Sequence, residues 1–326
     1  MYPFIFTKVK DSAEAISTIG ANPHAKFIGG GTNLLDLMKM NIEKPAQLID
    51  INNLGLKKIE VQSSGNILIG ALVRNSDLAY HATISKQYPL LSKALLSGAS
   101  AQLRNMATTA GNLLQRTRCY YFYDTVMPCN KREPGTGCSA LTGYNRMHAI
   151  LGTSDKCIAT HPSDMCVALA ALDTVIHVQN ATGSRTIQFA DFHLLPADTP
   201  QKETVLQPGD LITHIEIAPL PFAKNSTYVK VRDRASYEFA LTSAAVALDV
   251  RGGTIKAARI ALGGVGTKPW RATAAEQFIA GKPANGQTYK ATAALALKDA
   301  KGYQYNAFKI ELSKQAIISA LQNTGG

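Results

Sequence analysis

Five cysteines fall within one part of the chain, and four of them have the residue type and number that a metal centre requires. They follow the pattern Cys119-x9-Cys129-x8-Cys138-x18-Cys157, and the fifth is Cys166. Four thiolates can hold a [4Fe–4S] cluster, and a tetrahedron of four cysteines also binds Zn²⁺. The close cysteine pairs of zinc sites and the C-x2-C spacing of ferredoxins are both absent. The spacing alone therefore leaves the metal open.

Three consecutive glycines, Gly29 to Gly31, follow the apolar pair Phe27-Ile28 and precede a helical stretch from Leu34. Glycines admit positive φ and let backbone N–H groups approach an anion closely. The N-terminus of a following helix also favours a phosphate. A tight turn without a ligand is the plainer alternative, but three glycines exceed what a turn needs. The segment is neither G-x-G-x-x-G nor a Walker P-loop, so neither a Rossmann nor an ATPase site is indicated.

A second turn of small and hydroxyl-bearing residues runs from Thr108 to Asn112. Alone, this turn is typical of a helix-capping loop. A pyrophosphate, however, needs hydrogen-bond donors from more than one side. The two turns together therefore predict a phosphate-binding cleft.

Alternating strand and helix signals surround these turns and predict an α+β fold. Strands are expected at 4–9, 25–28, 47–51, 58–62, 66–69, 175–178, 185–188, 211–217, 227–232, 243–250 and 255–262. Helices are expected at 12–19, 34–40, 74–80, 88–96, 163–171 and 308–323. Residues from about 116 to 160 form a loop-rich insert that needs an internal staple, because it cannot bury much apolar surface of its own. We expect three units, at 1–55, 56–221 and 222–326.

The overall composition is that of an ordinary globular protein, with 46% hydrophobic and 17% charged residues among 326. The net charge of +11 is spread along the chain without a basic block, so an acidic protein partner is favoured over nucleic acid. No apolar run reaches the roughly 20 residues of a membrane span. The start of the chain lacks a signal-peptide pattern. We therefore expect either a cytoplasmic protein or one exported to the periplasm with a signal-bearing partner.

Several motifs, in this order along the chain, resemble those of the flavin subunits of molybdenum hydroxylases. They are GGGTNLL, RNMATTAGNLL, HPSDM, YVKVRDRASYEFALTSAAVAL and GGVGTKPWR. The resemblance covers nearly the whole chain and is strongest for the periplasmic aldehyde oxidoreductase branch. It implies a two-part FAD-binding domain of the vanillyl-alcohol-oxidase or xanthine-dehydrogenase flavin type, carrying the cysteine-rich insert, followed by a small α/β C-terminal domain.

The same resemblance implies which residues contact FAD. The first turn would wrap the pyrophosphate, the second would lie on its other side, and Asp164 would accept hydrogen bonds from ribityl or ribose hydroxyls. Lys230 would place a cation near the isoalloxazine. The implied FAD-contacting residues are Lys26, Phe27, Ile28, Gly29, Gly30, Gly31, Thr32, Asn33, Leu34, Thr108, Gly111, Asn112, Asp164, Ile212 and Lys230. Tyr237-Glu238-Phe239 departs from the acidic sequence of xanthine dehydrogenases, which puts NAD use in doubt.

For the insert, the resemblance favours a [4Fe–4S] cluster over zinc, with Cys119, Cys129, Cys138 and Cys157 as ligands. Cys166 lies in an apolar run typical of a buried helix, where a thiol behaves as a small hydrophobe. His148 could substitute as a ligand, but four cysteines suffice. For His161 a loop hydrogen-bonding role is expected.

The function implied is electron transfer. The chain would act in a heterotrimer with a molybdenum-cofactor subunit and a [2Fe–2S] subunit, passing electrons through FAD to an external acceptor. No catalytic residue is expected in this chain, and no hydrolytic motif is present. A stand-alone flavin reductase of the enolpyruvoyl-glucosamine reductase type and a zinc-stapled binding protein without flavin are the alternatives.

Overall fold

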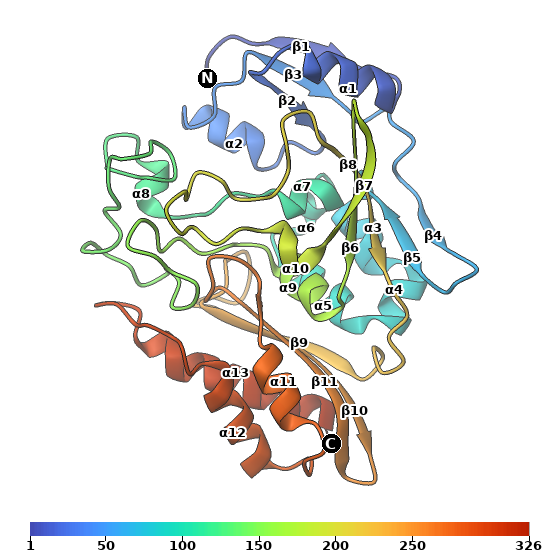
Figure 1. Ribbon diagram of the computed structural model, residues 1–326, viewed down its shortest axis with the longest axis vertical. Helices are drawn as coiled ribbons and strands as arrows, with labels where there is room; N and C mark the ends of the chain where they lie inside the picture. The colour runs from blue at the N-terminus through green and yellow to red at the C-terminus, as the bar shows by residue number, and fades with distance from the viewer. Residues whose placement is uncertain (326) are drawn as a thin grey trace.

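A computed structural model describes residues 1–325 and contains three sheets placed one after another along the long axis of the molecule (Figure 1). The N-terminal sheet lies at one end and the C-terminal sheet with its helices at the other. The predicted fold class, an α+β flavin-binding fold with a small C-terminal domain, is confirmed. The expected boundaries at residues 55 and 221 stay a prediction.

The N-terminal sheet is parallel, in the order β1-β3-β2, with β1 at Ile5–Lys8, β2 at Ala25–Ile28 and β3 at Gln47–Asp50. Helix α1 (Ser12–Gly20) begins at Asp11, whose side chain accepts a hydrogen bond from the Glu14 N–H at 2.8 Å. Helix α2 (Leu34–Lys39) follows β2 across the three glycines. Leu72 and Leu211 of the next unit complete the core of this sheet. The glycine turn therefore sits at the carboxyl end of a parallel strand.

The second sheet is antiparallel, in the order β4-β5-β8-β6-β7. Its strands are β4 (Ile59–Val61), β5 (Ile67–Gly70), β6 (Val175–Asn180), β7 (Gly183–Gln188) and β8 (Leu211–Ile217). Its helices are α3 (Asn75–Tyr80), α4 (Ala82–Gln87), α5 (Pro89–Ser97), α6 (Ala101–Arg104), α7 (Thr109–Leu113), α9 (Asp164–Ala171) and α10 (Phe189–Phe192). Helix α9 lies within one residue of the expected helix at 163–171, and Ser163 is its N-cap, with the hydroxyl accepting from the Cys166 N–H at 3.0 Å. All of α9 after Asp164 is buried, because it packs between helix α5 and the C-terminal sheet.

The insert between α7 and α9 contains a single short helix, α8 (Tyr120–Tyr123), among its otherwise irregular backbone. A β-bridge pairs Cys129 with Cys138. Ile150 and Leu151 of the insert pack in the hydrophobic core of the C-terminal domain. The insert thus gains order by packing on its neighbours rather than from a core of its own.

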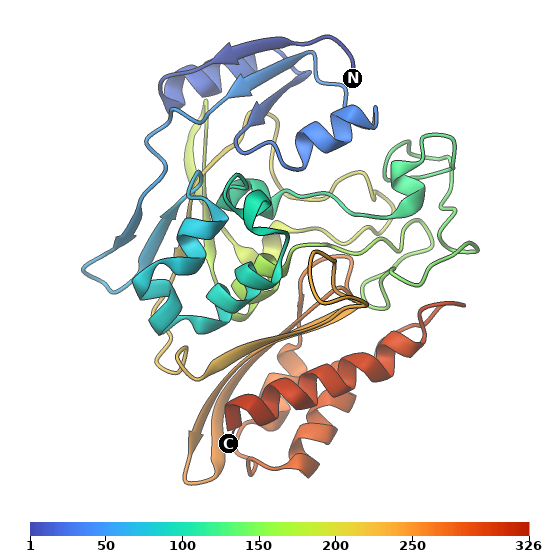
Figure 2. The ribbon, with the colours of Figure 1, turned by 180° about the vertical axis from the view of Figure 1, so that it is seen from behind.

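The C-terminal sheet is antiparallel, in the order β12-β11-β10-β9. Its strands are β9 (Ser226–Val231), β10 (Thr242–Arg251), β11 (Thr254–Gly263) and β12 (Trp270–Arg271). Helices α11 (Thr273–Ile279), α12 (Gly286–Ala296) and α13 (Phe308–Gly325) cover one face. Figure 2 shows α13 running along this face toward the insert. Helices α5 and α9 cover the other face, so the two larger units share a layer.

Strands β1 to β11 agree with their predicted positions to within two residues, while strand β12 and helices α4, α6, α7, α8, α10, α11 and α12 were not predicted. Apart from α12, each of these helices has at most seven residues, which is too short to show a clear 3.6-residue period. Among residues 1–325, no helix combines the length and apolarity that a membrane crossing requires.

Candidate functional site: a flavin cavity beside a four-cysteine insert

The two predicted turns meet backbone to backbone. A Cβ placed on Gly30 would lie 1.9 Å from the carbonyl oxygen of Met106, so only glycine permits this approach. Gly31 has a φ of +71°, which a side chain would strain. On the second turn, the Thr108 hydroxyl accepts from the Gly111 N–H at 3.3 Å and begins α7. The glycines therefore bring two backbone segments together around one space.

That space is a cavity of about 1110 Å³ between the N-terminal sheet, α5–α7 and the start of α9. Every residue predicted to contact FAD lines this cavity except Ile212. Ile212 belongs to β8, and its side chain is buried in the core. Two buried polar atoms of the lining, Asn33 Nδ2 and Asn75 Oδ1, have no partner within residues 1–325. A cavity of this size, with close backbone approach and unpaired polar groups, suits a dinucleotide such as FAD.

Asp164 and Lys230 form a buried ion pair at the floor of this cavity, with 2.8 Å between Nζ and Oδ2. The Tyr228 hydroxyl donates to Oδ1 of the same carboxylate at 2.6 Å, and Lys230 also donates to the Ser97 carbonyl. Burial and the adjacent Asp164 carboxylate raise the pKa of Tyr228 well above its usual range. The charge of Lys230 is therefore balanced by the Asp164 carboxylate. The sequence resemblance implies a separate FAD contact for each of these two residues.

The four predicted cysteine ligands line one common space in the insert. All are free thiols, and Cys129 and Cys157 are buried. Burial raises the pKa of Cys119 to about 12 and that of Cys157 to about 11, so these thiols need an adjacent positive centre to become thiolates.

The separations of the sulfurs bear on the kind of centre. Four thiolates around Zn²⁺, each about 2.3 Å from the metal, lie only about 3.8 Å apart. No three of the four thiols come within 4.8 Å of one another; within residues 1–325 only His161, Cys166 and His193 form such a group. The arrangement of the thiols thus leaves the kind of metal centre open.

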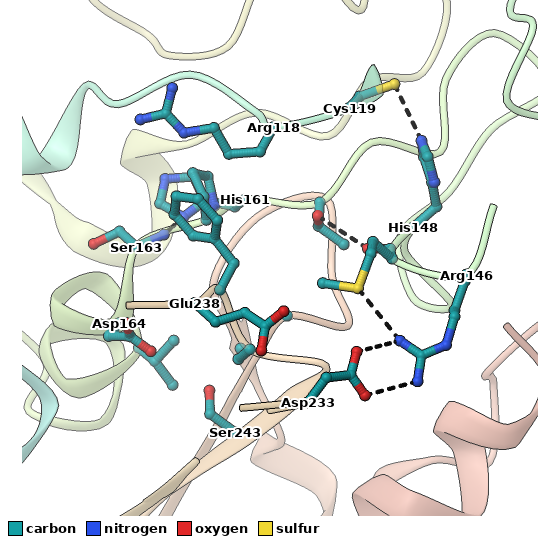
Figure 3. Close-up of a pocket in the computed structure, with 18 of the residues that line it drawn as sticks. Arg118, Cys119, Arg146, His148, His161, Ser163, Asp164, Asp233, Glu238 and Ser243 are labelled. Carbon is teal, nitrogen blue, oxygen red and sulfur yellow. Dashed lines mark hydrogen bonds and ion pairs between the residues drawn. The ribbon is translucent and has the colours of Figure 1, made fainter. Parts of the chain in front are cut away.

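A second cavity, of about 410 Å³, lies between the flavin cavity and the insert (Figure 3). Asp164 and Phe239 line both this cavity and the larger one, while Cys119 lines it from the insert side. Arg146 and Asp233 form a two-point ion pair across its wall, at 2.6 and 2.8 Å. This cavity therefore connects the lining of the flavin cavity with Cys119 of the insert.

Comparison with known proteins fits this geometry. Residues 2–221 match the family described as FAD binding domain in molybdopterin dehydrogenase, and residues 227–309 match the CO dehydrogenase flavoprotein C-terminal domain. The chain belongs to the FAD-binding subunits of the molybdenum hydroxylases. The C-terminal match argues against a stand-alone reductase, and the FAD family argues against a binding protein without flavin.

Curated relatives of this flavin subunit extend over its length. The aldehyde oxidoreductase FAD-binding subunit PaoB of Escherichia coli is 52% identical, covering 98% of each chain. The glyceraldehyde dehydrogenase medium chain of Sulfolobus acidocaldarius is 28% identical, covering 89% of this chain and 86% of its own. Among solved structures, quinoline 2-oxidoreductase from Pseudomonas putida 86 superposes with a TM-score of 0.77 at 23% identity, covering 99% and 97% of the two chains. This last likeness supports the fold alone.

The flavin subunit also carries an ionic network that the sequence did not reveal. Glu43 pairs with Lys26 at 2.7 Å and with Arg116 at 2.6 Å, and Arg116 continues to Glu203, which also binds Lys131. Burial alone would raise the pKa of Glu203, but the nearby cations hold it below its usual range. The positive charges of Arg116 and Lys131 in the insert are thus balanced by carboxylates. The network joins the first glycine turn to the insert, through residues far apart in sequence.

The group of His161, Cys166 and His193 lies apart from the cysteine cavity, as expected for Cys166. His193 Nε2 lies 3.0 Å from the Leu113 carbonyl, and its ring packs edge-on against Phe192 at 4.8 Å between centroids. Burial lowers the pKa of His193 to about 4, so the imidazole is neutral. This group is packed into the aromatic surroundings of α10.

Proposed function

We propose that this chain is the electron-transfer subunit of a molybdenum-containing aldehyde oxidoreductase and that it holds both FAD and a [4Fe–4S] cluster. It would receive electrons from [2Fe–2S] clusters on one partner, downstream of a molybdenum-cofactor subunit, and pass them through FAD to an external acceptor. The observation that carries the proposal is the 52% identity to an aldehyde oxidoreductase flavin subunit, together with four thiols around one space in the insert.

In this role FAD supplies a centre that exchanges electrons singly or in pairs. The residues of this chain hold and orient it. The glycine turns would present backbone N–H groups to the pyrophosphate, and Asp164, held by Tyr228 and Lys230, would accept hydrogen bonds from the ribityl or ribose hydroxyls. The second cavity gives the acceptor a route to the flavin, past Tyr237 and Phe239.

The purified complex with its partner subunits tests this function through its absorption spectrum and its metal content. Flavin bands together with a broad iron–sulfur shoulder are expected, with iron exceeding what the [2Fe–2S] subunit alone accounts for. Flavin with zinc in place of the additional iron would refute the cluster and leave the flavin role standing. A protein lacking flavin would refute both.

Cys129→Ser tests the ligand set directly. Loss of the additional iron is expected, because a serine hydroxyl is a poor replacement for a buried thiolate ligand, and the insert should become protease-sensitive. FAD content should stay near that of the wild type. Cys166→Ala is the matched control, since Cys166 lies outside the cysteine cavity and should keep all its iron. Unchanged iron in Cys129→Ser would reject Cys129 as a ligand.

We also propose that the complex resides in the periplasm, carried there folded with a signal-bearing partner. Cell fractionation with and without the signal of that partner distinguishes this from a cytoplasmic complex. The subunit should follow the partner in both cases.

A further inference from the structure

His148 makes a side-chain contact with one of the four cysteines. Its Nε2 lies 3.1 Å from the Cys119 sulfur, and the residue is only 2% exposed (Figure 3). Its ring packs near Tyr120 and Tyr121, with centroids 6.5 and 6.3 Å away. Within residues 1–325, no other side chain makes a hydrogen bond to any of the four sulfurs; the remaining donors are backbone N–H groups, such as that of Ala159 to Cys157. His148 therefore makes Cys119 different from the other three.

The chemistry of a metal-bound sulfur assigns the proton in this contact. A thiolate that binds iron carries no hydrogen and can only accept, so the proton lies on Nε2 of the imidazole. We propose that His148 is a positioning residue that donates a hydrogen bond to the Cys119 thiolate and thereby raises the reduction potential of the [4Fe–4S] cluster. The inference rests on the proposed function, because it requires that the cluster be present.

The direction of the effect follows from charge. Reduction adds negative charge to the cluster and its sulfurs, and an N–H dipole pointing at a sulfur stabilises the more negative state. The stabilisation is larger in a buried site than in water, because the local dielectric constant is low. Removing the donor therefore makes the cluster harder to reduce.

The backbone around His148 is fixed from the C-terminal domain, which keeps the ring in this orientation. The fully buried ammonium of Lys309 donates to the carbonyls of His148 at 2.9 Å and of Gly264 at 2.5 Å. The Asn306 amide donates to the same His148 carbonyl at 3.2 Å, and the His148 N–H donates to Asn145 at 3.0 Å. The contact with Cys119 is thus held by α13 and the segment before it.

His148→Phe tests the proposal, because it keeps a ring of similar shape and removes the donor. Redox titration of the purified complex, followed by electron paramagnetic resonance of the reduced cluster, should give a more negative midpoint potential. A tenfold fall in the equilibrium constant for reduction is expected, which is about 59 mV for a one-electron couple. His148→Gln, which retains an N–H donor, should restore part of the shift. Tyr120→Phe is the matched control: it keeps the ring beside His148, loses a hydroxyl, and should leave the potential unchanged.

The outcomes separate the two proposals. Absence of the cluster signal from the wild-type complex would refute the proposed cluster itself. A wild-type signal with the same potential in His148→Phe would refute the role of His148 alone. Loss of iron in His148→Phe, with iron retained in Cys119→Ser, would make His148 a ligand and overturn the proposal.

A measurement on the wild type avoids dependence on the folding of a variant. With ¹⁵N-labelled histidine, pulsed electron paramagnetic resonance of the reduced cluster should detect one weakly coupled histidine nitrogen. Absence of any histidine coupling would overturn the hydrogen bond.

Discussion

The flavin cavity is lined at its glycine turns by backbone groups that regular elements hold in place, whereas the neighbouring insert offers side chains from a segment with one short helix. In the first region the critical feature is the absence of a side chain, as at Gly30, whose position leaves no room for a Cβ. In the second, four thiol side chains face one space, and ion pairs and buried hydrogen bonds replace regular structure. Two adjoining regions of one chain can therefore depend on different properties of its residues.

The largest expected effect is a loss of FAD affinity, and it tests whether the flavin cavity and the insert are independent. Gly30→Ala should lower FAD affinity by at least about 100-fold, because the added methyl group would lie 1.9 Å from the Met106 carbonyl and must push the turns apart. Flavin absorbance per protein after gel filtration measures the loss, and iron content should remain. Gly20→Ala at the end of α1 is the control, since nothing lies within 4 Å of the added carbon. Equal loss of flavin and iron in Gly30→Ala would show that the two regions are not independent.

A smaller effect is expected where the two cavities meet. Asp164→Asn leaves the buried ammonium of Lys230 without a counter-charge, and breaking a buried pair costs about 3–5 kcal/mol. The variant should lose that much unfolding free energy in the FAD-free chain and should also bind FAD more weakly. Denaturant unfolding of the flavin-free protein checks the first result. The exposed Asp191→Asn should change the free energy by less than about 0.5 kcal/mol. Full stability in Asp164→Asn would show that the pair is held for the ligand alone.

The smallest effect concerns the insert and depends on pH. The pKa of Glu203 is lowered in the folded protein, so its ionised form stabilises the fold above the unfolded value of 4.5, and this contribution disappears as the pH falls through the folded pKa. Glu203→Gln should therefore lower the free energy of unfolding by about 2–3 kcal/mol at pH 7. This is less than breaking a fully buried ion pair costs, because about a quarter of the Glu203 side chain is exposed.

Melting temperatures between pH 3 and 7 check this dependence. Wild type and Glu203→Gln should converge at the acid end and separate toward neutrality. Glu133→Gln, an exposed insert residue, should follow the wild-type curve throughout. Parallel curves for wild type and Glu203→Gln would show that the network contributes nothing through its charge.

The sequence predicted the strands and the glycine turns well because both depend on local features. Strand β8 was predicted with its observed bounds, and the helix expected at 163–171 agrees with α9 and its N-cap Ser163. The Lys230–Asp164 pair could not be found in this way, because it joins residues 66 positions apart across two domains. The same holds for the Glu43–Arg116–Glu203 network. Ile212 was named as an FAD contact only because of the family resemblance. Side chains along a strand point alternately to its two faces, and that of Ile212 points into the core.

The buried contacts of Lys309 and Asn306 link the C-terminal domain to the loading of the proposed cluster. Lys309 lies in the first turn of α13 and Asn306 just before it, and both hold the backbone of the insert at His148 and Ala149. The cysteines of the proposed cluster would therefore reach their final positions only once the C-terminal domain has folded. A truncation before Asn306 would then cost the protein this cofactor although all four of its ligands are still present.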